Sequence, residues 1–366
     1  MSTPLSSPSA RPRAALVGGA LAVLLSAAAC APADTGGAEP PGDGGVEREL
    51  AFEGGGHEVS ASFRTPHDAS GRVPGALIIS GSGPTDRDGN APARPDADTN
   101  RNLSRVLAEA GVASLRYDKF GSGPDPQTGE ETGPGGVRTI DPVDPEVFDR
   151  QVVAAYEELV AQPEVDPGRV VVVGHSEGAL YALRAHELIG SGRPSPALVL
   201  AAPPGTRYLD LVDRQVTEQV RLAEGAGQIE EAEAVQLLSD MRAGRAAIRG
   251  GRGLTSQESD QLGLYTPWNA DFLSFMDGLD PVELGRDLPE GTPVLVLWGE
   301  DDAQVSREDV DRLMTGLDGA ERVDLPGTDH ILRAFEDEPG AAVLDSDRPF
   351  AEGVAPAMEE FLDTAW

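Results

Sequence analysis

The chain has 366 residues and is strongly acidic, with 62 acidic and 29 basic residues and a formal net charge of −33. Such a surface repels polyanions, so the charge excludes nucleic acid as a partner and opposes direct binding to anionic lipid. A single cysteine excludes a disulfide within the chain, and the length suffices for one large domain with a sizeable core. The basic residues are 28 arginines and one lysine, a ratio typical of a GC-rich genome.

The beginning of the chain has the features of an export signal. Arg11 and Arg13 precede an apolar run over residues 14–29, which is short for a membrane-spanning helix and typical of a signal peptide. Cys30 follows three alanines. A sole cysteine in this place resembles a bacterial lipobox, although Ala27 stands where leucine is usual. The resemblance implies a lipid anchor on Cys30 of a cell-surface lipoprotein. The alternative is ordinary cleavage and free secretion.

Composition divides the rest of the chain into a tether and a domain. Residues 1–30 form the expected signal peptide, and residues 31–49, rich in glycine, proline, alanine and acids, form a flexible tether. One domain is expected over residues 50–366. Short alternating runs around a glycine turn predict an antiparallel hairpin at the sheet edge, formed by residues 50–52 and 59–63.

After the hairpin, predicted strands alternate with predicted helices. Apolar runs predict strands at residues 75–80, 112–117, 169–173, 196–201, 293–298 and 321–325. Helical spacing predicts helices near residues 99–110, 145–161, 177–189, 306–315 and 351–364. Asp144 is the expected N-cap of the second helix, with Pro145 at its first position. The alternation predicts an α/β fold with a mostly parallel, doubly wound sheet covered on both faces.

The strand at 169–173 leads directly into a motif that carries chemistry. Gly174-His175-Ser176-Glu177-Gly178 matches G-x-S-x-G and is followed by a predicted helix. In a tight turn between strand and helix, the serine hydroxyl rises above the sheet and the helix N-terminus points at the reaction centre. Flanking side chains would clash in such a turn, which explains Gly174 and Gly178. The motif predicts that Ser176 is a nucleophile; the alternative is a chance match in a chain with 44 glycines.

A serine nucleophile needs a base, and the chain has five histidines. His57 and His67 belong to the first hairpin, upstream of the sheet that carries the motif. His186 lies more than two helical turns beyond the nucleophile, and His175 is expected to face away from the pocket. His330 alone lies in a loop downstream of a candidate acid. We therefore expect His330 to be the catalytic base.

The acid should follow a later strand, since Ser, acid and His come in that order when the nucleophile occupies such a turn. Glu300, Asp301 and Asp302 come directly after the strand at 293–298. Carboxylates at this place would point to the same sheet edge as Ser176. The residues by themselves leave the choice among these three open.

Attack on a carbonyl develops negative charge on its oxygen, and backbone N–H groups must stabilise it. One donor is expected at Glu177, the residue after the nucleophile. The other is expected at Ser82, in the loop Ser80-Gly81-Ser82-Gly83-Pro84 after an early central strand, where glycine allows a close approach of the backbone. The alternative is a simple Gly/Pro turn.

These motifs resemble those of the α/β-hydrolase superfamily. Gly299, Asp302 and Val305 match its G-x-x-D-x-x-V pattern, which implies Asp302 as the acid and leaves Asp301 as the second choice. The segments SGSGPTDRDGN, from Ser80, and LRYDKFGSG, from Leu115, resemble a bacterial subgroup that consists mostly of esterases and acyl hydrolases. In that subgroup the first segment forms the oxyanion side of the site. Phe120 replaces an arginine of the subgroup pattern, and the resemblance covers residues 48 to 366.

Residues 203–288 interrupt the alternation where hydrolases of this superfamily carry a cap. Helical spacing of apolar residues predicts two amphipathic stretches, one with Leu209, Val212, Val216 and Val220, the other with Ile229, Val235, Leu238 and Met241. Four aromatic residues then follow within twelve positions: Tyr265, Trp268, Phe272 and Phe275. Our hypothesis is that this cap insertion covers Ser176 and that its aromatics line an acyl pocket. The alternative is that they pack the cap onto the core.

The sequence thus predicts a serine hydrolase that cleaves small-molecule carboxylic esters through an acyl-serine, with Ser176, His330 and Asp302 as its triad. Alternatives with the same triad are a peptidase, an amidase or an acyltransferase; a third class is a non-catalytic binding lipoprotein. No cofactor is expected. No metal is expected either, because Arg101 and Leu107 stand where a calcium loop beginning at Asp96 would need glycine and glutamate. The oligomeric state is left open.

Overall fold

The computed structural model describes residues 44–92, 94–123, 144–190, 192–252, 254, 264–336 and 344–366. The expected signal peptide, Cys30 and most of the expected tether lie outside these residues. Within them, no helix combines the length and apolar character that crossing a membrane requires.

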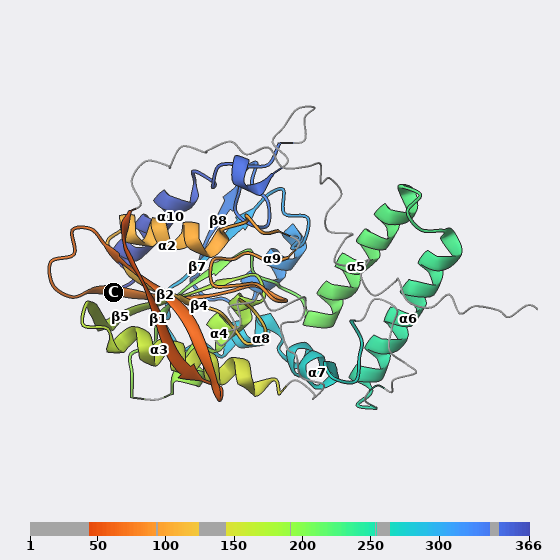
Figure 1. The fold of residues 1–366 in the computed structure, drawn as a ribbon, viewed down its shortest axis with the longest axis horizontal. Helices are drawn as coiled ribbons and strands as arrows, with labels where there is room; N and C mark the ends of the chain where they lie inside the picture. Colours follow the sequence, from red (N-terminus) through yellow and green to blue (C-terminus); the bar gives the residue numbers. More distant parts are fainter. Residues whose placement is uncertain are drawn as a thin grey trace, which may run out of the picture.

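One eight-stranded sheet forms the centre of the molecule, in the order β1-β2-β4-β3-β5-β6-β7-β8 (Figure 1). Its strands are β1 (Gly45–Gly54), β2 (His57–Pro66), β3 (Val73–Ile79), β4 (Ala113–Tyr117), β5 (Val165–His175), β6 (Ala197–Ala201), β7 (Val294–Gly299) and β8 (Glu321–Leu325). The β1–β2 and β2–β4 pairs are antiparallel, and all other pairs are parallel. The predicted α/β fold with an antiparallel hairpin at its edge is confirmed.

The hairpin is longer than its sequence pattern predicts. Gly45 already pairs with Pro66, and the ladder continues to Gly54 and His57. Residues 45–49 of the expected tether therefore belong to the sheet. Charged side chains conceal this strand in the sequence: Arg48 of β1 pairs with Glu164, and Glu47 pairs with the buried Arg116 of β4.

Alternate residues of the central strands pack into two separate hydrophobic cores, because successive side chains of a strand point to opposite faces of the sheet. Val170 and Val172 of β5 face one core, and Val171 and Val173 face the other. The first core is covered by α3 (Glu146–Ala161), α4 (Gly178–Ile189) and α9 (Arg307–Met314), the second by α2 (Thr99–Glu109) and α10 (Val354–Thr364) (Figure 1). Burial on both faces explains the continuous apolar runs in these parallel strands.

The start of α3 differs from the prediction by one residue. The helix begins at Glu146, and Pro145 occupies the N-cap position rather than the first helical one. The Asp144 side chain still accepts a hydrogen bond from the Glu146 N–H, at 3.0 Å. The expected capping interaction is thus made from one residue further out.

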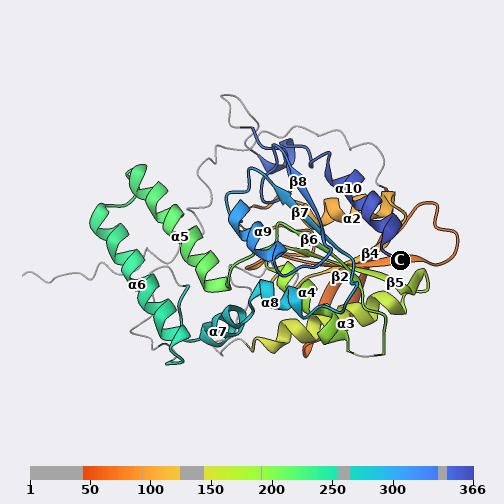
Figure 2. The ribbon, with the colours of Figure 1, turned by 180° about the vertical axis from the view of Figure 1, so that it is seen from behind.

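The segment between β6 and β7 forms a helical projection beside the sheet (Figure 2). It contains α5 (Tyr208–Gly225), α6 (Glu231–Arg249), α7 (Ala270–Gly278) and α8 (Pro281–Arg286). We call α5, α6 and α7 the cap; it has a small core of its own that includes Leu209, Val216 and Met241. Contrary to the prediction, Val235 does not belong to this core, because it is 63% exposed. Ala234 and Leu237 of α6 are buried instead.

Candidate active site

Ser176 occupies a strained turn between β5 and α4. Its φ is +53°, a left-handed value that a non-glycine residue rarely adopts. A Cβ on Gly174 would overlap the backbone of Gly178, and a Cβ on Gly178 would overlap the Ile79 carbonyl oxygen. The Ser176 N–H donates to the Ala201 carbonyl at 2.8 Å, which ties the turn to the end of β6. Both glycines of the motif are therefore sterically required.

Asp302 and His330 meet at the same edge of the sheet. Asp302 follows β7, and its Oδ2 accepts a hydrogen bond from His330 Nδ1 at 2.8 Å. The Asp302 Oδ1 accepts from the backbone N–H groups of Gln304 and Val305, at 2.7 and 2.9 Å. These bonds orient the carboxylate and explain why the spacing from aspartate to valine matters. Because Nδ1 is taken by Asp302, Nε2 is the ring nitrogen that can receive a proton.

The neighbouring acids point elsewhere. Glu300 pairs with Arg307 at 2.8 Å, and Asp301 is exposed. Asp302, by contrast, is 8% exposed and contacts the histidine directly. Of the three acids that the sequence leaves open, the structure brings only Asp302 to His330.

Hydrogen bonds and ion pairs hold the loop that carries His330 in place, and the residues that make them are not predicted from the sequence. The Asp329 carboxylate accepts from the backbone of Ile331 and of Arg333, each at 3.1 Å, and pairs with Arg348 at 2.8 Å. Arg333 in turn donates to the Ala97 carbonyl at 2.9 Å. The contacts of Arg348 and Arg333 with Asp329 and Ala97 join residues 19 and 236 positions apart in the chain, so no local pattern reveals them.

Contrary to the prediction, His175 does not face away from the pocket. Its ring lies 5.1 Å from the ring of His330, centroid to centroid, and its Nε2 donates to the His330 carbonyl at 2.9 Å. Burial lowers the pKa of His175 to about 4, and the neighbouring His330 adds to this shift. A neutral His175 can donate from Nε2 and thereby supports the backbone of the catalytic candidate.

The loop after β3 approaches the nucleophile closely. A Cβ on Gly81 would lie 3.3 Å from the Ser176 Cβ, so a side chain at this position would crowd the nucleophile. The Ser82 carbonyl accepts from Thr85 Oγ1 at 2.7 Å, which closes the loop. Within the part of the chain that the structure describes, the N–H groups of Ser82 and Glu177 have no hydrogen-bond acceptor. Both expected oxyanion donors therefore remain available.

The two sequence segments that carry the subgroup resemblance contact each other. Arg116 of β4 donates to Asp88 at 2.7 Å, and Asp118 accepts from the backbone N–H of Arg87 at 2.8 Å. Burial raises the pKa of Asp118 to about 6, against the opposing effect of Arg87. These reciprocal contacts hold the loop after β3 against β4, which gives a physical reason for the paired motifs.

The four aromatic residues expected to form one pocket lining are separated. Tyr265 is fully buried inside the cap core, against Gly244, and Trp268 is 50% exposed. Phe275 packs beneath the Arg184 guanidinium, 5.2 Å from it. Phe272 contacts the rings of Phe148 and Tyr208, which belong to other elements. Tyr265 and Trp268 precede α7, whereas Phe272 and Phe275 lie within it, and the four side chains have different surroundings. The single lining predicted from their proximity in sequence is therefore wrong.

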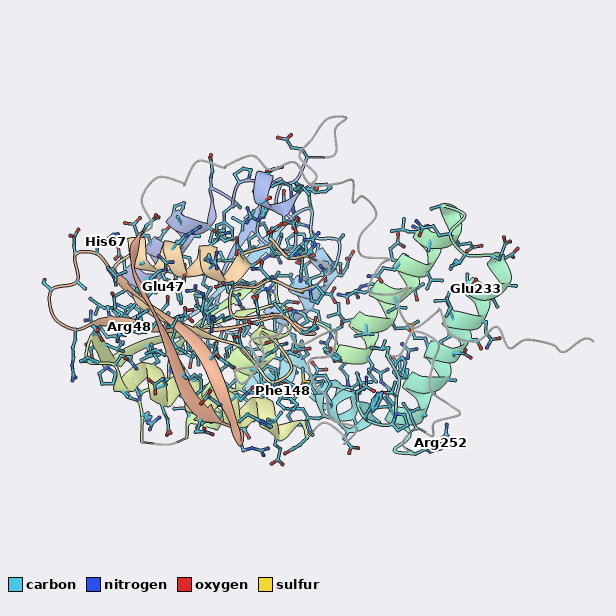
Figure 3. The ribbon with its side chains drawn as sticks, in the orientation of Figure 1. Glu47, Arg48, His67, Phe148, Glu233 and Arg252 are labelled. Carbon is cyan, nitrogen blue, oxygen red and sulfur yellow. The ribbon has the colours of Figure 1, made fainter. Side chains whose placement is uncertain are left out.

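A different group of aromatic rings lies where the cap meets the core. Phe272 is 5.3 Å from Phe148 of α3 and 6.2 Å from Tyr208 of α5, between ring centroids. Phe148, labelled in Figure 3, also approaches Phe120 and Tyr181, at 6.2 and 6.3 Å. Phe120, which replaces the arginine of the subgroup pattern, thus has a packing role here. Sequence reasoning misses this group because its five members come from five different segments of the chain.

Lys119 is a further residue that sequence reasoning misses. It is 7% exposed and contacts the Gly81 carbonyl and the Glu177 carboxylate, beside the nucleophile. The signal was present in the composition, as the only lysine among many arginines, but composition does not show where a residue lies. No group of three or more metal-ligating side chains occurs in the described ranges.

A comparison with known families supports the fold. The model of the alpha/beta hydrolase family matches residues 92–346, more than half of the chain. The chain belongs to the alpha/beta hydrolase family. A comparison with curated proteins finds no match. For this hydrolase, the family accounts for the sheet topology, but one fold hosts many chemistries.

Solved structures share the fold of this hydrolase at low identity. Est1E from Butyrivibrio proteoclasticus, solved with bound ferulic acid, is 16% identical with a TM-score of 0.51, covering 86% of this chain and 98% of Est1E. An esterase from Pyrococcus furiosus is also 16% identical, with a TM-score of 0.50, covering 91% of this chain and 96% of that one. At these identities, the likeness concerns the fold alone.

Proposed function

We propose that this hydrolase cleaves carboxylic esters through an acyl-serine intermediate, with Ser176 as nucleophile, His330 as base and Asp302 as acid. One observation carries the proposal: a serine in strained backbone geometry lies at the sheet edge where a buried aspartate holds a histidine at 2.8 Å. Strain of this kind persists where surrounding structure enforces it, and it gathers at active sites. The two esterases with the same fold are consistent with this choice of substrate class.

The proposed reaction follows from the positions of these groups. His330 Nε2 takes the proton of Ser176 as the hydroxyl oxygen attacks the ester carbonyl, and Asp302 stabilises the resulting imidazolium. The negative charge on the carbonyl oxygen is met by the N–H groups of Ser82 and Glu177. His330 then protonates the leaving alcohol, and water activated by His330 releases the acid from Ser176.

The aromatic group at the junction of cap and core is our candidate for the substrate pocket. Phe148, Tyr208 and Phe272 are partly buried, and they approach the core near α4, whose N-terminus carries Glu177. An apolar lining with few polar groups is typical of small-molecule sites. We therefore propose that an apolar part of a small-molecule ester contacts these rings.

Hydrolysis of p-nitrophenyl esters from acetate to palmitate tests the proposal. The purified protein should hydrolyse at least one member of the series, and the chain-length profile should reveal the size of the pocket. Absence of turnover on every ester, with an amide or peptide substrate hydrolysed instead, would show that the scissile bond is not an ester. Absence of all turnover would overturn the enzymatic reading.

We also propose that the protein is exported and anchored by a lipid on Cys30. The support is the basic and apolar sequence before this sole cysteine. Labelling of cells with a palmitate analogue should mark the wild-type protein and leave a Cys30→Ser variant unmarked. An unmarked wild-type protein in the culture medium would instead indicate ordinary cleavage and secretion.

A further inference from the structure

Lys119 is the only lysine of the chain, and it is buried beside the candidate nucleophile. It follows β4 and is 7% exposed. Lysine is almost never buried to this degree unless its charge is paired. Here its ammonium donates to the Gly81 carbonyl and lies 3.4 Å from Glu177 Oε1. Both partners belong to the segments proposed to form the oxyanion hole.

The first contact bears on the orientation of one peptide unit. The Gly81 carbonyl and the Ser82 N–H belong to the same trans peptide, so they point in opposite directions. An ammonium that holds the carbonyl on one side keeps the N–H turned to the other. Gly81 itself lies against Ser176, where its Cβ position is 3.3 Å from the Ser176 Cβ. Holding this peptide therefore controls whether Ser82 can serve as a donor.

The second contact bears on charge. Glu177 is 5% exposed, and its N–H is the other proposed oxyanion donor. An uncompensated carboxylate on this residue would oppose the negative charge that develops on the carbonyl oxygen. Burial raises the pKa of the nearby Tyr208 hydroxyl well above its ordinary value, and the Glu177 charge adds to this shift, so Tyr208 stays neutral. Lys119 supplies the compensating positive charge at 3.4 Å.

We propose that Lys119 is a positioning residue of the oxyanion hole. Its ammonium holds the Gly81–Ser82 peptide with the N–H available to the substrate oxygen, and it neutralises Glu177. This inference rests on the proposed function. It predicts that loss of Lys119 weakens stabilisation of the transition state while substrate binding in the ground state is largely kept.

The test compares Lys119→Met with a matched control. Methionine keeps an unbranched side chain and removes the charge. Arg184→Met is the control, because Arg184 is 8% exposed and pairs with Asp149 at 2.7 Å, outside the catalytic groups. On the best p-nitrophenyl ester we expect Lys119→Met to lower kcat about 100-fold, with KM changed by less than about 3-fold. Arg184→Met should lower thermal stability yet keep kcat within about 2-fold of wild type.

A trifluoromethyl ketone provides a readout that loss of stability does not affect. Its adduct with Ser176 carries the same oxyanion, so its affinity should fall in Lys119→Met by about the same factor as kcat. The double variant Lys119→Met/Glu177→Gln removes the unpaired carboxylate and should regain part of the lost kcat. A folded Lys119→Met with wild-type kcat and wild-type ketone affinity would overturn the proposal. An inactive wild-type protein would instead overturn the proposed function.

The single lysine also permits a test that needs no variant at Lys119. Protein labelled with 13C at the lysine side chains should give one Cε resonance. We expect this resonance to shift when the trifluoromethyl ketone is added to wild-type protein and to remain unchanged in Ser176→Ala. If Lys119→Met fails to fold, an unchanged resonance in inhibited wild-type protein would still contradict the proposal, because a group that contacts both donor segments must sense the adduct.

Discussion

Ser176 lies in a closely packed turn of the sheet region, whereas the cap packs around a separate hydrophobic core of its own. On the core side, a Cβ on Gly174 or on Gly178 would overlap neighbouring backbone atoms. Ser176, Asp302 and His330 are all less than 10% exposed. On the cap side, α5 and α6 pack mainly on each other, and their far ends project away from the sheet, as Glu233 of α6 does in Figure 3.

Polar contacts hold the helices of the cap together. Asp277, at the end of α7, is 2% exposed and pairs with Arg207 and Arg249, at 3.0 and 2.8 Å. It also accepts a hydrogen bond from the Leu209 N–H at 3.0 Å. Tyr208 and Phe272 contact the hydrophobic clusters of both regions. The core therefore positions the reacting groups, and cap residues at the junction can vary the substrate.

The largest effect should come from the core, at Asp302. Asp302→Asn keeps the shape of the side chain but offers His330 a group without negative charge, so kcat should fall by about 10³ to 10⁴. Asp301→Asn is the matched control and should leave kcat within about 2-fold, because Asp301 is exposed. Steady-state hydrolysis of the best ester measures both. An Asp301 effect larger than that of Asp302 would reverse the assignment of the acid.

A pH-dependent effect on stability should follow from His175. Its folded-state pKa of about 4 lies below the ordinary value of 6.5. Between these values the unfolded chain binds a proton that the folded protein does not, so stability falls as the pH drops through this window. The loss is on the order of 3 kcal/mol at pH 4 relative to pH 7.

Comparing wild type with His175→Asn isolates the contribution of His175 to the change of stability with pH, since all carboxylates are common to both proteins. Urea unfolding at several pH values should show that wild type loses more stability than the variant on acidification. Parallel curves for the two proteins would mean that His175 is protonated in the folded state, and solvent would then reach it more than its 6% exposure indicates.

The smallest effect should come from the cap, at Phe272. Phe272→Ala removes the ring that contacts Phe148 and Tyr208, so the ratio of kcat/KM between long and short esters should change about 5-fold. Trp268→Ala truncates an aromatic that is 50% exposed and should leave the ratio within about 2-fold. An unchanged ratio together with lower stability of Phe272→Ala would assign this ring to packing alone.

The difference between core and cap also explains which parts of the fold and of the site can be predicted from the sequence. Local patterns are enough to predict the sheet and the meeting of the loops that carry Ser176, Asp302 and His330, because parallel strands end at one edge. Lys119 contacts residues 38 and 58 positions away in the chain, so no local pattern predicts its place. Proximity in sequence places the four cap aromatics in one group, whereas helix and loop geometry separates Tyr265, Trp268 and Phe275.

Covalent labelling of Ser176 tests the central claim most directly. Wild type and Ser176→Ala should each be treated with a fluorophosphonate, measured by intact mass and digested to locate the label. The account predicts one label per chain, on the peptide that contains Ser176, with complete loss of ester hydrolysis, and no label on the variant. A label on another residue, or hydrolysis retained in Ser176→Ala, would contradict it.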